Sequence, residues 1–179
     1  MSSDAELTRR FIDGDEEAFD ALYRRHVRLV VSIAVAMTGS SEEARDLSQE
    51  VFLQVHRAVG SLRNPEAFVG WLRQITVRLC LRHRRRRDRE ESVEAALVAS
   101  EDPARPDDLT EARDAVALLW RLLDGLDAED RAVVVLRDIE GMSYAEIADA
   151  MGWTLAKMKT RLHRARAALA RGYRQLEGE

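Results

Sequence analysis

Apolar residues recur every three or four positions along most of the chain, and strict alternation of apolar and polar residues is nowhere sustained. The first pattern is typical of amphipathic helices, and the second would indicate half-buried strands. The stretch from Phe19 to Ala34 shows the helical spacing clearly, with Leu22, Val27 and Val30 on the same face. The pattern predicts an all-α protein without a sheet.

Local start and stop signals predict four helices in the first half of the chain. They cover about residues 3–12, 15–38, 40–59 and 64 into the arginine tract that follows. Ser40 and Glu43 have capping-box spacing, and Asn64 followed by Pro65 is a typical N-cap and first helical position. Gly39 is expected to end the second helix.

The second half predicts a helix-turn-helix after two further helices, at about residues 109–123 and 127–139. Ser143 with Glu146 forms a second capping-box pattern, Gly152 ends that helix, and Thr154 caps a long final helix. Two helices joined by the short turn MGWT have the proportions of a DNA-binding motif. The apolar faces are expected to pack inward; they comprise Ala145, Ile147, Ala148 and Met151 before the turn, and Met158, Leu162, Ala165 and Leu169 after it.

Charge is arranged in blocks that divide the 179-residue chain. Residues 71–89 hold eight arginines against Asp88 alone, whereas residues 90–114 hold nine acids and two of the three prolines. An acidic stretch with prolines between two basic segments is typical of a linker. The sequence therefore predicts two small helical domains, residues 1–88 and 109–179, joined by an acidic linker at 89–108.

The residue types and motifs present argue against several classes of protein. The single cysteine, Cys80, excludes an internal disulfide and a multi-cysteine zinc site. The four histidines are scattered, and no glycine-rich phosphate loop is present. We expect no catalytic residue, no metal and no cofactor. The polar N-terminus and an apolar run of only nine residues, 29–37, favour a cytoplasmic protein that is not inserted in a membrane.

The strongest candidate chemistry lies in the final helix. Residues 157–174 carry seven Lys or Arg residues and no acid, although the whole chain has a formal net charge of −4. The polar residues Lys157, Lys159, Thr160, Arg161 and Arg164 are expected on its outward faces, where they can meet phosphate and bases in a major groove. Lys157 and Arg161 are expected to reach guanine edges. The alternative is a solvated basic face without a ligand.

Two more candidate surfaces lie in the first domain. Asp46, Gln49 and Glu50 share one face of the third helix, and such an acidic and amide cluster suits a basic protein partner better than DNA. The segment that begins FVGWLRQI combines Trp71 with an arginine-rich helix, which suits exposed bases and backbone of melted DNA. The alternatives are a solvated polar face for the first surface and core packing for Trp71.

Segments in both halves of the chain resemble a known protein family. DLSQEVFLQVHRAVGSL and FVGWLRQI resemble region two of bacterial sigma factors of the extracytoplasmic-function (ECF) type, and LDAEDRAVVVLRDIEGMSYAEIADAMGWTLAKMKTRLHRARAAL resembles region four. The resemblance covers about residues 5–88 and 109–174. It implies a factor that binds core RNA polymerase and directs promoter-specific transcription initiation. Promoter DNA, core polymerase and an anti-sigma factor are the implied partners, without an obligate homo-oligomer.

The resemblance also implies roles for individual residues. Core polymerase would contact Asp46, Gln49 and Glu50. The minus-ten element would contact Ser61, Arg63, Asn64, Trp71, Arg73, Gln74, Arg78 and Arg82. The minus-thirty-five element would contact Thr154, Leu155, Lys157, Lys159, Thr160, Arg161 and Arg164.

The chain departs from the family pattern at a few positions, and other functions remain to be weighed. Region four usually opens with Leu-Pro, where this chain has Leu126 and Asp127, and Arg78 and Arg82 stand where the family often has Asn and Asp. These departures bear on the promoter sequence. The first alternative function is a stand-alone helix-turn-helix regulator that acts without polymerase, and the second is a helical enzyme, for which no motif argues.

Overall fold

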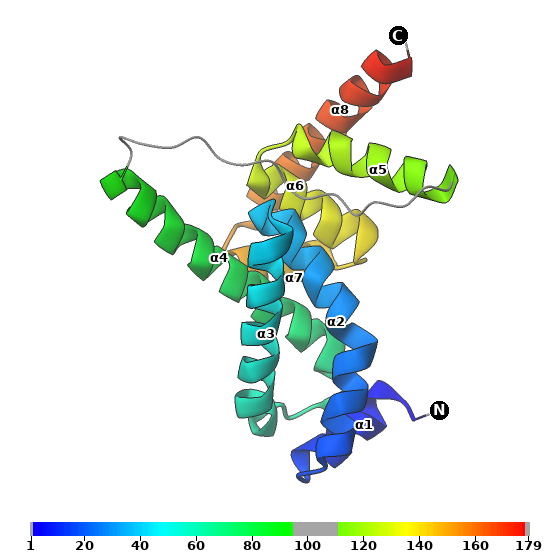
Figure 1. Cartoon of the computed structure of the whole chain (residues 1–179), viewed down its shortest axis with the longest axis vertical. Helices are drawn as coiled ribbons and strands as arrows, with labels where there is room; N and C mark the ends of the chain where they lie inside the picture. The colour runs from blue at the N-terminus through cyan, green and yellow to red at the C-terminus, as the bar shows by residue number, and fades with distance from the viewer. Residues whose placement is uncertain (1, 95–110, 178–179) are drawn as a thin grey trace. The chain divides into compact units, whose positions relative to one another are not determined.

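The structure is a computed structural model that describes residues 2–94 and 111–177 (Figure 1). No strand occurs among these residues, so the prediction of an all-α fold is confirmed. The chain divides into two compact units, Met1–Leu97 and Val98–Glu179, and each is described by itself.

Unit 1 contains four α-helices, and side chains directly before them cap three of these, among which the cap at Ser40 was predicted. The helices are α1 (Asp4–Ile12), α2 (Glu16–Thr38), α3 (Ser41–Ala58) and α4 (Phe68–Glu94), with 3-10 turns η1 (Val59–Ser61) and η2 (Pro65–Ala67) before α4. The side chains of Ser3, Asp15 and Ser40 accept hydrogen bonds from the first free amides of α1, α2 and α3. Gly39 ends α2 in the left-handed conformation, with φ of 75°.

The core of unit 1 forms where α2 packs against α1, α3 and α4. Leu22, Val51, Phe68 and Leu72 have at most 1% of their surface exposed. Burial of an aromatic or aliphatic side chain of this size stabilises the fold by about 1.5–3 kcal/mol. The core therefore fixes which faces of α3 and α4 remain available to partners.

Helix α4 is longer than predicted. It continues to Glu94, through the first six residues of the predicted linker. The rest of the predicted linker, residues 95–108, lies outside the described residues.

Unit 2 contains α5 (Glu111–Asp124), α6 (Ala128–Val134), α7 (Tyr144–Met151) and α8 (Leu155–Glu177). The helix expected at 127–139 is α-helical only to Val134 and continues as a π-helical turn, η3 (Val135–Ile139). Leu136, Ile147 and Met158 are fully buried and join η3, α7 and α8 in one core. Helix α8 also packs against α5 and α6, so three other helices of unit 2 hold it in place.

Candidate nucleic-acid and protein interfaces

The polar face of α3 lies where the sequence places it. Asp46, Gln49 and Glu50 are exposed, while Leu47 and Val51 of the same helix are buried. A buried apolar side and an exposed polar side on one helix leave this face free to contact another macromolecule.

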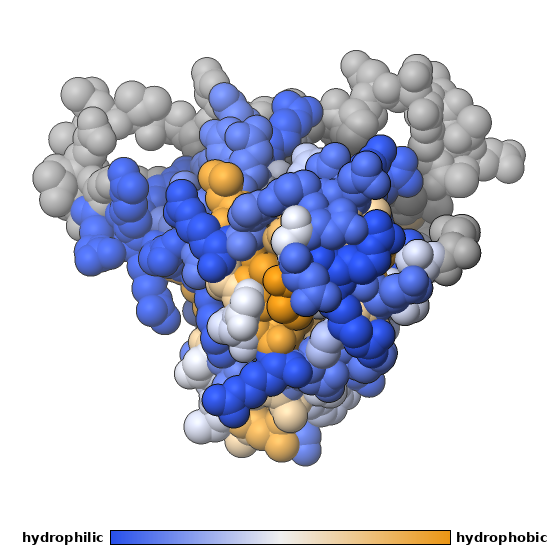
Figure 2. Space-filling view, turned by 90° about the horizontal axis from the view of Figure 1, so that it is seen from below, coloured by the Kyte–Doolittle hydropathy of each residue, from blue (hydrophilic) through white to orange (hydrophobic). Residues whose placement is uncertain are grey.

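One residue of this α3 face was missed by the sequence reading. Leu53 is 56% exposed and follows Asp46 by seven residues, so it lies on the same side of α3. The i, i+3, i+4, i+7 spacing could have identified it. Figure 2 shows one face of the molecule, on which apolar side chains appear in several small areas between hydrophilic ones. An exposed leucine beside carboxylates gives the face an apolar contact in addition to its charges.

Carboxylates of α3 face the arginine tract of α4. Arg82 Nη2 lies 3.0 Å from Glu50 Oε1, and Arg87 Nη1 lies 2.5 Å from Glu43 Oε1. His83 Nδ1 is 3.7 Å from the other oxygen of Glu43. Glu43 does not complete the capping box, because its side chain contacts α4 and the Ser40 amide donates to Thr38 Oγ1 at 3.2 Å instead. The carboxylates of α3 also provide anions for a tract whose like charges repel one another.

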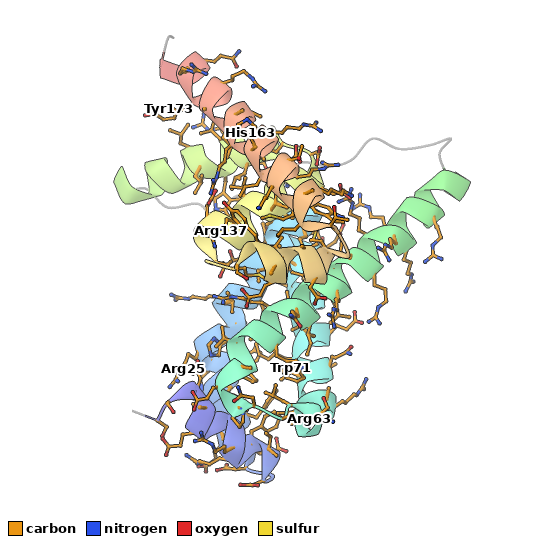
Figure 3. The ribbon with its side chains drawn as sticks, turned by 180° about the vertical axis from the view of Figure 1, so that it is seen from behind. Arg25, Arg63, Trp71, Arg137, His163 and Tyr173 are labelled. Atoms are coloured by element: carbon orange, nitrogen blue, oxygen red, sulfur yellow. The ribbon has the colours of Figure 1, made fainter. Side chains whose placement is uncertain are left out.

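The loop before α4 exposes polar side chains at the amino-terminal end of that helix. Ser61, Arg63 and Asn64 are all exposed. Asn64 Oδ1 accepts a hydrogen bond from the Glu66 amide at 3.1 Å, so the residue caps η2 as predicted. Its side-chain amide nitrogen is not used by that contact. Figure 3 shows Arg63 and Trp71 at the beginning of α4.

Four predicted residues of α4 share one stripe. Trp71, Gln74, Arg78 and Arg82 recur at three- and four-residue spacing, and the two arginines are exposed. Trp71 is half-buried, packs against the core and lies 6.2 Å from the Phe68 ring centroid. Core packing therefore accounts for part of its side chain, and its remaining surface lies on the stripe.

Arg73 does not lie on this stripe of α4. It lies about 200° around the helix from Trp71, given about 100° per residue. Its Nε is buried without a hydrogen-bond partner in the described part of the chain. Burial is the main cause that lowers the pKa of His26 in α2, and the positive charge of Arg73 adds to it. The structure thus separates Arg73 from the other predicted minus-ten residues.

The turn between α7 and α8 has the expected local construction. Ser143 and Glu146 form a complete capping box at the start of α7. Gly152 ends α7 with φ of 67°, a conformation that favours glycine. Thr154 Oγ1 accepts a hydrogen bond from the Lys157 amide at 3.2 Å and begins α8. The inward faces are confirmed except at Ala145, which is exposed, and at Leu169, which is only half-buried; Ala150 is buried instead.

Helix α8 exposes most of the predicted recognition residues. Met158, Leu162 and Ala165 are at most 2% exposed and anchor the helix. The exposed set comprises Thr154, Leu155, Lys157, Lys159, Thr160 and Arg164. Within it, Lys157, Thr160 and Arg164 recur at three- and four-residue spacing and form one continuous line. Lys157 Nζ lies 4.3 Å from the centroid of the Trp153 ring, a cation–π contact from the turn.

Arg161 is the exception, because it does not lie on an outward face. Its guanidinium contacts Asp127 at 3.0 Å, Glu129 at 2.7 Å and Asp130 at 2.8 Å, and its side chain is 23% exposed. The hydrogen bond that Arg161 donates to the Asp130 carboxylate is the main cause that raises the pKa of Arg161. The prediction that Arg161 points outward is therefore wrong. The sequence could not show these contacts, because the acids lie 31 to 34 residues away from Arg161.

A second arginine of α8 is also held within unit 2. Arg166 pairs with both carboxylate oxygens of Asp138, in η3, with 3.0 Å between Nε and Oδ2. Two of the seven positive charges in residues 157–174 therefore have carboxylate partners within the chain.

The described residues show no group of three or more His, Cys, Asp or Glu side chains that could hold a metal ion. Cys80 is buried, and burial raises the pKa of its thiol to about 12, so the thiolate is not formed at neutral pH. Among the helices of the described ranges, none is both long and apolar enough to cross a membrane.

Two family models match the chain in the order of these units. Sigma-70 region 2 matches residues 22–90, and Sigma-70, region 4 matches residues 117–169. The chain is 38% identical over 171 residues to the ECF RNA polymerase sigma factor SigM of Mycobacterium tuberculosis, which covers 94% of this chain and 84% of the relative. The chain belongs to the ECF sigma factors. As such it is a transcription factor that binds core RNA polymerase and directs initiation at promoters.

Other comparisons agree with this sigma-factor assignment. The RNA polymerase sigma-H factor of Pseudomonas aeruginosa is 30% identical over 186 residues, covering 98% of this chain and 96% of the relative. The sigma factor RpoE, solved in complex with the anti-sigma factor NepR from Bartonella quintana, has a TM-score of 0.72 at 20% identity, covering 87% of this chain and 96% of that one. CnrH, solved with the cytosolic domain of CnrY, has a TM-score of 0.64 at 24% identity over 99% of both chains. The two solved structures show the same fold.

The region 2 match also bears on the alternative function. A stand-alone helix-turn-helix regulator would need only unit 2, but the sigma factor carries region 2 as well. The alternative is therefore not favoured.

Proposed function

We propose that this sigma factor performs initiation with three surfaces, two of which adjoin where Arg82 of α4 pairs with Glu50 of α3. The α3 face (Asp46, Gln49, Glu50 and the neighbouring Leu53) contacts core polymerase. The α4 stripe (Trp71, Gln74, Arg78 and Arg82), with the loop residues Ser61, Arg63 and Asn64, contacts the minus-ten element. The α8 line (Lys157, Thr160 and Arg164), with Thr154, Leu155 and Lys159, contacts the minus-thirty-five element.

The observation that carries this proposal is the distribution of charge on exposed helix faces. The α3 face offers two carboxylates and an amide, whereas the α8 line offers cations and a hydroxyl. Carboxylates repel DNA phosphates and attract a basic protein surface, while Lys and Arg bind phosphate and guanine edges. Leu155, 44% exposed, adds an apolar group suited to a thymine methyl.

The α4 stripe suits single-stranded promoter DNA. An aromatic ring at one end and exposed arginines along the helix supply stacking and backbone charge. Arg73 is left out of this surface because its Nε is buried on another side of α4. Arg161 is left out of the α8 surface because its guanidinium lies against three carboxylates.

We propose further that the factor acts in the cytoplasm, where its polymerase and promoters are, and that an anti-sigma factor regulates it. The similarity of fold to RpoE, which was solved bound to the anti-sigma factor NepR, supports this partner. A protein that covers the α3 face and its exposed Leu53 would compete with core polymerase. Neither role needs an obligate homo-oligomer.

The α3 face is tested by the variant Asp46→Lys, Glu50→Lys. We expect it to weaken binding to core polymerase, because truncating or reversing desolvated interface charges costs about 2–5 kcal/mol. The control variant Asp13→Lys, Asp20→Lys changes net charge equally at two other exposed sites, directly after α1 and within α2. Co-purification with core polymerase is the measurement. Equal co-purification of both variants, with intact folding by circular dichroism, would rule out this face.

A further inference from the structure

Arg161 is the most heavily engaged basic side chain of α8. Three carboxylates from the start of α6 surround its guanidinium: Asp127, Glu129 and Asp130, at distances of 2.7 to 3.0 Å. Asp127 is also the N-cap of α6 and accepts a hydrogen bond from the Asp130 amide at 2.9 Å. One side chain therefore joins the second turn of the recognition helix to the first turn of its supporting helix.

The positive charge of Arg161 offsets the repulsion among the three carboxylates at this site. The side chain of Asp130 is only 9% exposed, and that of Glu129 is 27% exposed, so neither is fully hydrated. The positive end of α6 favours carboxylates in its first turn, but three of them close together repel one another. Burial disfavours the ionised form of Asp127, yet the Asp130 amide and Arg161 more than offset it, and the pKa of Asp127 lies below its usual value.

The position of Arg161 on α8 also separates it from the α8 line. It follows the buried Met158 by three residues and precedes the buried Ala165 by four, so it borders the anchored side of the helix. Its guanidinium could reach a base only by leaving all three carboxylates. Arg164, by contrast, is exposed on the outward side.

We infer that Arg161 is a positioning residue, which fixes the angle of α8 against the start of α6 and does not itself contact DNA. This inference rests on the proposed function, in which α8 reads the minus-thirty-five element. It predicts that neutralising the acids at this site weakens promoter binding, although removing negative charge near DNA ordinarily strengthens it.

The test uses the full chain bound to core polymerase and a promoter library with a randomised upstream element. The key variant is Asp127→Asn, Glu129→Gln, Asp130→Asn, which keeps side-chain size and the cap of α6 while removing the charges. We expect roughly tenfold weaker binding on every sequence, with unchanged base preference. Arg161→Ala should weaken binding alike, and Arg161→Lys should recover part of it because the ion pair is retained.

A variant that combines both changes tests whether Arg161 and the three acids act through the same contact. Arg161→Ala added to the three neutral substitutions should weaken binding no further than either change alone, because both break the same contact. All measurements are made well below the unfolding temperature of each variant, so that loss of folded protein does not contribute. Unchanged or tighter binding by the neutral triple variant, or a changed base preference in Arg161→Ala, would overturn the inference.

Arg164→Ala is the matched control. It should change preference among upstream sequences while leaving the unfolding temperature unaltered. If Arg164→Ala and Lys157→Ala both have no effect, α8 does not read this element, and the proposed function of α8 fails independently of the role of Arg161.

Discussion

At the scale of single residues, charge partners decide which side chains can act on a ligand. Lys157 and Arg161 are four residues apart and look equivalent in sequence, yet one is exposed and the other is held by three carboxylates. The sequence could not distinguish them, because the partners of Arg161 lie more than 30 positions away. Ser143, Thr154 and Asn64 were predicted correctly as caps because their partners are two or three residues away.

His26 provides a residue-scale prediction about pH. Burial lowers its pKa more than the carboxylate of Asp4, 3.0 Å away, raises it, and Arg25 and Arg73 lower it further. An unfolded histidine binds a proton near pH 6.5, so below about this pH the unfolded state binds more protons than the folded state. The free energy of unfolding of unit 1 should therefore fall as pH falls through this range.

Trp71 can report this unfolding, since it lies in unit 1 next to Phe68, which contacts His26. Urea unfolding is followed by fluorescence in a Trp120→Phe, Trp153→Phe protein between pH 5 and 7.5. His26→Gln should reduce the dependence on pH, whereas His163→Gln, an exposed position in unit 2, should retain it. An equal dependence in the His26→Gln protein would contradict this account.

At the scale of elements, local signals predicted where helices begin better than where they end. The predicted end of α4 was placed at the change from arginines to acids, but Glu and Arg both favour helix, and α4 continues to Glu94. The π-helical turn η3 was missed because nothing in the run of apolar residues before it marks an altered hydrogen-bond register. Arg137 donates a hydrogen bond to the Met142 carbonyl at 2.7 Å across this turn, a contact that only the folded chain brings about.

The loop before α4 carries an element-scale prediction. Asn64→Asp retains the side-chain oxygen that caps η2 but removes the amide donors and adds a negative charge next to the proposed DNA surface. We expect unchanged thermal unfolding and reduced promoter opening, measured as permanganate reactivity of promoter thymines. Gln175→Glu adds the same charge at an exposed position near the carboxyl end of α8, outside all three proposed surfaces, and should open promoters normally. Normal opening by Asn64→Asp would remove Asn64 from the minus-ten surface.

At the scale of the whole molecule, function follows from the separation of charge along the chain. The net charge is −4, but residues 157–174 are basic throughout, and the acidic face lies on a helix of the other unit. Binding to DNA through α8 should therefore depend strongly on salt in spite of the acidic total. The sequence predicted this division because charge blocks are visible without a structure, whereas the internal pairing of Arg161 and Arg166 reduces the number of cations available to DNA.

The central claim is that the chain directs core polymerase to promoters rather than acting on DNA alone. Run-off transcription of a genomic fragment library, with core polymerase in the presence and absence of the full-length protein, tests it directly. We expect discrete transcripts only when both are present, and their loss in the Asp46→Lys, Glu50→Lys protein. Transcripts that do not depend on the protein, together with tight specific binding of the isolated protein to the same fragments, would contradict the claim.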